Sequence, residues 1–76
     1  MPRFNPGDSV YIFTTHDFTR HDLVGKEGII YKRFGEISDY YWVFIPDMPG
    51  CGRGVSDDPM TNICYPVNSR QIELRG

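Results

Sequence analysis

The sequence lacks the features that mark a membrane protein or a disulfide-bonded secreted domain. No apolar run approaches the roughly 18 residues that cross a bilayer, and the opening MPRFNPGDSV lacks the charged-then-apolar order of a secretory signal. Two cysteines, Cys51 and Cys64, are too few for a disulfide framework. We therefore expect a cytoplasmic protein without membrane contact. We also expect two free thiols, with Cys64 buried, although one bridge stays open until the distance between the two Cα atoms is known.

An excess of positive charge is also missing. Eight Lys and Arg residues stand against ten Asp and Glu residues, which gives a formal net charge of -2. Proteins that grip nucleic acid by neutralising phosphates are usually clearly basic, so this balance counts against a general DNA or RNA binder. The acidity is concentrated in residues 36–60, where five acidic groups and one basic group give -4.

Helical periodicity is nearly absent as well. No segment keeps apolar residues at helical spacing for three turns, and eight glycines and six prolines interrupt the chain throughout. Short β-branched and aromatic runs predict five strands, at residues 9–13, 29–34, 40–45, 63–67 and 71–74, with a single helical turn at 68–70. Regularly spaced short strands favour a small barrel or sandwich. With 76 residues, we expect one domain, 1–76, without room for a large enclosed substrate cavity.

Three segments have sequences that define their expected places in the sheet. Residues 40–45 are apolar at six consecutive positions, so that strand should be covered on both faces. Pro66 cannot donate to a strand ladder, which places its strand at an edge. Residues 46–60 hold three prolines and three glycines, and they predict one long loop outside the sheet. Loops of that length in a small domain are often functional.

Gly25 and Gly28 flank a predicted turn before the second strand. Glycine is favoured there by a positive φ or by a close approach of the backbone. A phosphate-binding loop would require a helix directly after the glycines, whereas a strand is expected here. The two glycines therefore predict a structural turn and no nucleotide site.

Two segments and the C-terminal tail resemble known small barrels. Residues 6–12, PGDSVYI, resemble the G-D-x-V-x-I opening of SH3-like barrels, and residues 23–30, LVGKEGII, resemble the turn and strand of KOW modules. The same turn is similar to the variable chain of ferredoxin:thioredoxin reductase and to a small photosystem subunit of the PsaE type. Residues 65–74 look like the strand, helical turn and final strand that close such barrels. The resemblance implies an all-β, five-stranded SH3-like barrel with one long loop, and it does not select a function.

Strand alternation predicts an apolar outer face. Five residues should point inward: Val10, Ile12, Ile30, Val43 and Ile45. Their neighbours should then point outward: Tyr11, Phe13, Ile29, Tyr31, Trp42 and Phe44. An exposed apolar patch usually marks an interaction surface, so this face could bind a partner protein or a second copy of the chain. The alternative is that the 46–60 loop folds back over the face through Met48, Val55 and Met60.

Charged residues give two further hypotheses. In the long loop, Arg53, Asp57 and Asp58 could contact a partner, or they could simply be solvated. Basic residues near the first hairpin, beside Tyr31 and Phe34, are typical of RNA recognition, in which rings stack on bases and cations meet phosphates. These candidate RNA-binding residues are Arg20, Lys26, Lys32 and Arg33, with Arg3 near them.

No grouping of residues predicts catalysis or a metal site. His16, His21, Cys51 and Cys64 match no compact ligand pair, and a Cys51, His21 and Asp22 triad would need a convergence that the sequence does not show. We therefore expect no catalytic residue, metal or cofactor. The predicted function is a non-catalytic protein-binding module, an accessory subunit of a larger enzyme, or a regulator such as a phage protein that binds a host complex. An RNA-binding or transcription- or translation-associated KOW-like module is the alternative.

Overall fold

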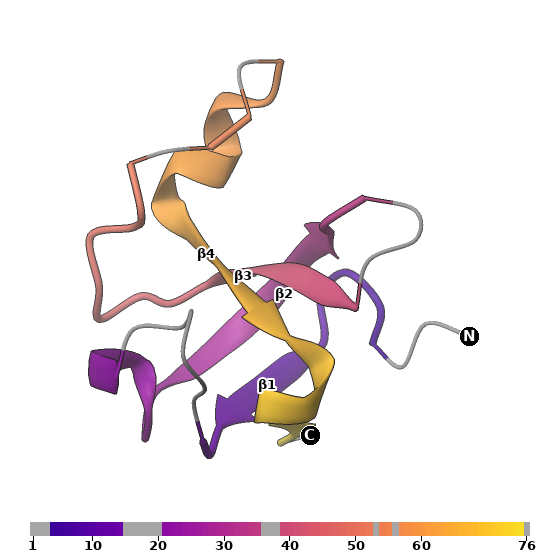
Figure 1. Cartoon of the computed structure of the whole chain (residues 1–76), viewed down its shortest axis with the longest axis vertical. Helices are drawn as coiled ribbons and strands as arrows, with labels where there is room; N and C mark the ends of the chain where they lie inside the picture. The colour runs from indigo at the N-terminus through magenta and orange to yellow at the C-terminus, as the bar shows by residue number, and fades with distance from the viewer. Residues whose placement is uncertain (1–3, 15–20, 36–38, 53, 56, 76) are drawn as a thin grey trace.

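Five antiparallel strands form one sheet in the order β4-β3-β2-β1-β5 (Figure 1). The structure is a computed structural model that describes residues 4–14, 21–35, 39–52, 54–55 and 57–75. The strands are β1 (Ser9–Ile12), β2 (Glu27–Arg33), β3 (Tyr40–Phe44), β4 (Cys64–Asn68) and β5 (Ile72–Leu74). Three short 3₁₀ segments join them: η1 (His21–Leu23), η2 (Pro59–Ile63) and η3 (Ser69–Gln71).

The all-β class and the five strands are confirmed, and the sheet of the described residues is not closed into a barrel. A barrel requires hydrogen bonds between the first and last strands of the order. Within the described residues, β4 pairs with β3, β5 pairs with β1, and the two end strands do not pair with each other. The chain crosses from β4 to β5 through η3, a single turn capped by Asn68 and Gln71. The helical turn before the last strand is therefore confirmed, one residue later than predicted.

The inner face of the sheet carries the core, as strand alternation predicted. Val10, Ile12, Ile30, Val43 and Ile45 are all buried. They pack with Tyr65, Val67 and Ile72 from β4 and β5, and with Phe4, whose ring meets the Tyr41 ring edge-on at a centroid distance of 5.5 Å. The core therefore lies on the inner face of the sheet, and the outer face is free to carry a site.

The positions of two strands in the sheet also follow the sequence. β4, which contains Pro66, is an edge strand. A proline at an edge denies a donor to any further strand and so protects the edge from additional pairing. β3 lies inside the sheet between β4 and β2.

None of the helical segments among the described residues is long and apolar enough to cross a membrane.

Gly25 and Gly28 are required for different reasons. Gly25 has a φ of 90°, in the left-handed region that favours glycine. Gly28 lies within β2, opposite Val10, where a Cβ atom would stand 2.6 Å from Val43 Cγ1 and 2.7 Å from the Phe44 carbonyl oxygen. The first glycine makes the turn, and the second lets β3 approach closely.

Residues 46–60 were predicted as one loop, but the last two of them begin the 3₁₀ segment η2. Asp58 caps η2 by accepting a hydrogen bond from the Met60 backbone N–H at 3.2 Å, and Pro59 occupies a first-turn position that suits proline. β4 consequently begins at Cys64 rather than at Ile63. In Figure 1, η2 lies above β4 at the top of the view, away from β1 and the C-terminus.

Hydrogen bonds attach the loop to η2. The Gly52 and Gly54 backbone N–H groups donate to the Asn62 backbone and side-chain oxygens at 3.0 and 2.8 Å. The Val55 N–H donates to Thr61 Oγ1 at 2.8 Å, and that buried hydroxyl donates to the Asp58 carbonyl oxygen at 2.8 Å. These bonds hold the loop and η2 together.

Candidate functional site

The outer face of the sheet carries a row of apolar side chains from three neighbouring strands. Ile29 on β2 lies opposite Phe44 on β3, and Phe44 lies opposite Cys64 on β4. Cross-strand neighbours on one face stand about 4.5 to 5.5 Å apart at their Cβ atoms, so the three side chains are in contact range. This row forms a continuous apolar floor.

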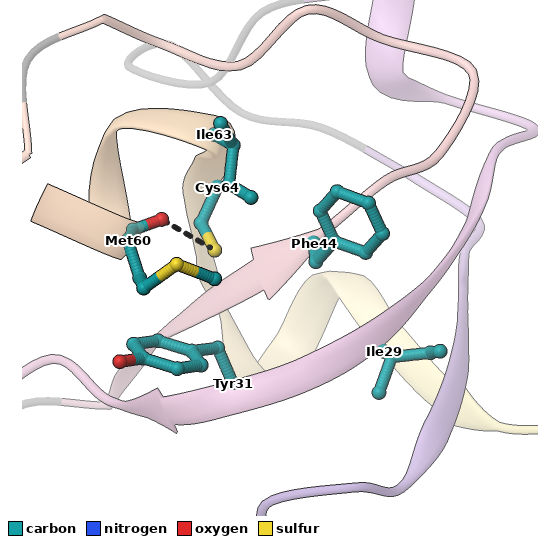
Figure 2. A pocket seen from close by; sticks show the side chains of 6 residues that line it. All are labelled: Ile29, Tyr31, Phe44, Met60, Ile63 and Cys64. Atoms are coloured by element: carbon teal, nitrogen blue, oxygen red, sulfur yellow. Dashed lines mark hydrogen bonds between the residues drawn. The ribbon is translucent and has the colours of Figure 1, made fainter.

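Residues of η2 and β2 enclose this floor and make a pocket of about 260 Å³. Figure 2 shows Met60 and Ile63 on one side and Tyr31 and Ile29 on the other, with Phe44 between them. We call this the η2 pocket, and its lining residues are Ile29, Tyr31, Phe44, Met60, Ile63 and Cys64. A cavity of about 150 Å³ already holds a benzene ring, so the η2 pocket has room for one bulky apolar side chain.

A β-bulge in β2 shapes one wall of the η2 pocket. The register with β3 shifts between Ile30, which is opposite Val43, and Lys32, which is opposite Trp42, so Tyr31 is an additional residue in the strand. A bulge re-aims the side chains next to it. Here Tyr31 and Lys32, although adjacent in sequence, both reach the same carboxylate.

That carboxylate belongs to Asp58, which joins the start of η2 to β2 through hydrogen bonds and an ion pair. The Tyr31 hydroxyl donates to both carboxylate oxygens at 3.1 Å, and Lys32 Nζ lies 2.6 Å from Oδ2. The Lys32 ammonium and the Tyr31 hydroxyl hold the pKa of Asp58 below its ordinary value. The same carboxylate raises the pKa of Lys32, while desolvation and Asp58 together raise the pKa of Tyr31. We call these three residues the Asp58 clamp.

Cys64 contributes a buried thiol to the η2 pocket. Its Sγ donates to the Met60 carbonyl oxygen at 3.6 Å, and burial together with the nearby Cys51 raises the pKa of the thiol to about 11. Neither cysteine forms a disulfide. The thiol at this position is therefore neutral at physiological pH and acts as an apolar lining group.

The predicted aromatic face is only partly exposed. Ile29, Tyr31 and Phe44 line the η2 pocket, as an interaction surface would require. Trp42 was expected to be exposed, and this is wrong: it points to the outer face but is 4% exposed. The Phe34 ring stacks on it at a centroid distance of 4.9 Å, and Lys32 and Pro66 flank it on the neighbouring strands. Trp42 is therefore a buried residue of the outer face and not an exposed anchor.

Tyr11 and Phe13 lie outside the η2 pocket. Tyr11 is half-buried under the Arg75 guanidinium, which stands 5.2 Å from the ring centroid and is bonded to Glu27 at 3.0 Å. Phe13 follows the end of β1 and is exposed. The alternative prediction, that the 46–60 loop folds back over the outer face, is met only in part. Met48 packs against the core, Val55 is exposed, and Met60 reaches the pocket.

The loop charges separate into different roles. Asp58 is bonded within the protein, which the sequence hypotheses of solvation or partner contact did not include. Asp57 next to it is exposed. Arg53 lies outside the described residues.

The predicted RNA-binding cations are not brought together. Lys26 precedes β2 and Lys32 is near its far end, roughly 20 Å away along the strand. Lys32 is paired with Asp58, and Arg33 is exposed. Arg20 and Arg3 lie outside the described residues, as does His16.

Sequence reasoning missed three pocket residues, Met60, Ile63 and Cys64, as parts of a binding site. Met60 and Ile63 belong to η2, which is too short to show a helical period, and Cys64 is the first residue of β4 directly after it. The sequence Asp58-Pro59 was the available signal, because Asp at the cap and Pro directly after it are typical of a helix start.

Comparisons give no relative from which a function could be transferred. No protein-family model, no curated protein and no solved structure matches the chain. Among the described residues, no group of three or more His, Cys, Asp or Glu residues could hold a metal ion. The proposal for function therefore rests on the η2 pocket and on the Asp58 clamp beside it.

Proposed function

We propose that the protein is a non-catalytic protein-binding module, an accessory or regulatory subunit, that receives an apolar side chain of its partner in the η2 pocket. The observation that carries this proposal is a pre-formed apolar hollow whose rim stays open to solvent. Met60 is 50% exposed and Ile63 is 39% exposed, while the floor residue Cys64 is buried. Burying such aliphatic surface stabilises a complex by roughly 25 cal/mol per Å² of apolar area removed from water.

The Asp58 clamp supports the proposal because it fixes the pocket before a partner arrives. A pocket that already has its bound shape avoids the ordering cost of association. RNA binding receives less support. Lys32 is paired with Asp58, while Lys26 lies before the start of β2 and Arg33 at its end.

The test is affinity capture with the intact chain, followed by mass spectrometry, using wild type, Ile63→Asp and the control Val24→Asp. Val24 is 41% exposed, nearly the same as Ile63, but it follows η1 and is not part of the pocket. We expect partners that survive nuclease treatment to be lost with Ile63→Asp and kept with Val24→Asp. Circular dichroism should show that both variants are folded.

Two results would contradict the proposal. One is a partner that binds Ile63→Asp as well as it binds wild type. The other is capture that disappears on nuclease treatment and on Lys32→Ala or Arg33→Ala substitution, which would replace the protein-binding proposal with the RNA alternative.

A further inference from the structure

We infer that the partner segment is basic: the η2 pocket accepts a bulky apolar side chain from a polypeptide that carries Lys or Arg next to that side chain. This inference rests on the proposed function and adds the charge of the partner to it. It follows from the chemistry of the pocket interior and from the charges around the opening.

The interior excludes charged groups. Its polar atoms are already bonded, since the Tyr31 hydroxyl donates to Asp58 and the Cys64 thiol donates to the Met60 carbonyl oxygen. A charge placed inside would lose its hydration without gaining a partner, which is unfavourable. The group that enters is therefore apolar, and any charge on the partner stays at the rim.

The rim is negative. The positive charge of Lys32 is cancelled by Asp58 at 2.6 Å. Asp57 is exposed directly beside Asp58, and it lies close enough to Lys32 to help raise the pKa of that ammonium. Rim charges of one sign steer and hold a partner of the opposite sign.

The same charges disfavour other occupants. A face-to-face pair of copies would place two acidic rims against each other, because a two-fold interface uses the same patch on both subunits. Nucleic acid would bring phosphates to Asp57. A basic polypeptide is the class of partner that satisfies both the apolar interior and the acidic rim.

The test is a titration of the ¹⁵N-labelled intact chain with three matched peptides, followed by NMR. The first is acetyl-Ser-Lys-Arg-Leu-Lys-Ser-amide, the second has Ala in place of Leu, and the third has Glu in place of every Lys and Arg. We expect the first peptide to bind best and to shift the amides of Ile29, Phe44 and Ile63. Its affinity should fall between 50 and 200 mM salt, as rim charges require.

A matched pair of protein variants locates the charge effect. Asp57→Asn should weaken binding of the basic peptide about threefold to fivefold, the usual range for one exposed charge. Asp39→Asn removes the same charge from an exposed residue at the opposite end of β3 from Phe44, and should change affinity less than about twofold.

The outcomes separate the two proposals. If the Glu peptide binds as tightly as the basic one, or if Asp39→Asn weakens binding as much as Asp57→Asn, the basic partner is wrong while the pocket stands. If the Ala peptide binds as well as the Leu peptide, or if no peptide shifts any pocket amide at millimolar concentration, the proposed function itself is wrong.

Discussion

Replacing Gly28 with alanine tests the close approach of β2 and β3, on which the site is built. The new Cβ would lie 2.6 Å from Val43 Cγ1, 2.7 Å from the Phe44 carbonyl oxygen and 3.1 Å from Ile45 Cγ1. Overpacking a tight core costs about 1 to 3 kcal/mol, and the lower entropy of the unfolded chain offsets about 0.4 to 1 kcal/mol of this. We therefore expect a net destabilisation of about 1 to 2 kcal/mol.

The assay is urea and thermal unfolding of wild type and Gly28→Ala. A domain of this size changes its melting temperature by about 4 to 8 °C per kcal/mol, so the expected fall is about 5 to 15 °C. The m-value should stay constant, because the change acts on the folded state. Gly28→Val adds two further methyl groups and should cost about 3 kcal/mol or more.

A double-mutant cycle identifies the clash as the cause. In Gly28→Ala/Val43→Ala the methyl group of Val43 that meets the new Cβ is gone. The double variant should then be more stable than the sum of the single effects by at least about 0.5 kcal/mol. An unchanged or higher melting temperature for Gly28→Ala would refute the packing argument.

Three further predictions concern charge, thiol chemistry and secondary structure. Because the pKa of Asp58 is lowered in the folded protein, its ionised form stabilises the fold above the unfolded pKa, and this contribution is lost as pH falls through the folded pKa. The stability advantage of wild type over Asp58→Asn should therefore shrink between pH 7 and pH 3. A difference in stability that stays constant over this range would exclude an ionic role. Iodoacetamide at pH 8 should modify Cys51 before Cys64, whose pKa is raised to about 11, and mass spectrometry of the native protein would contradict this if Cys64 reacted first. Far-UV circular dichroism should be β-type with less than about 15% helix, and a helix content near the usual third would overturn the fold.

Much of the sheet could be predicted because strand alternation is a local property. Val10 and Ile12 point inward two residues apart, and so do Val43 on β3 and Ile45 directly after that strand, so the core face was readable from spacing alone. Pro66 marked the edge for an equally local reason, its missing N–H group.

The pocket could not be predicted because it depends on how segments distant in sequence meet. The bulge at Tyr31 is defined by the register between β2 and β3, which no single strand encodes. Trp42 alternates outward as expected, yet its burial depends on Phe34, which lies beyond the end of β2. Asp58 was readable as a loop charge, but its bonds to Tyr31 and Lys32 span 27 and 26 residues of sequence.

The most direct test of the η2 pocket is a ¹³C-methyl NMR spectrum of the chain labelled at its three methionines. The Met60 methyl lines the pocket with Tyr31 and Phe44, whereas Met48 packs against the core. We predict nuclear Overhauser contacts from the Met60 methyl to these two rings. On addition of the basic Leu peptide, the Met60 methyl resonance should shift while the Met48 methyl resonance stays unchanged. A Met60 methyl without ring contacts, or one that does not move while the peptide binds, would contradict the pocket as the binding site.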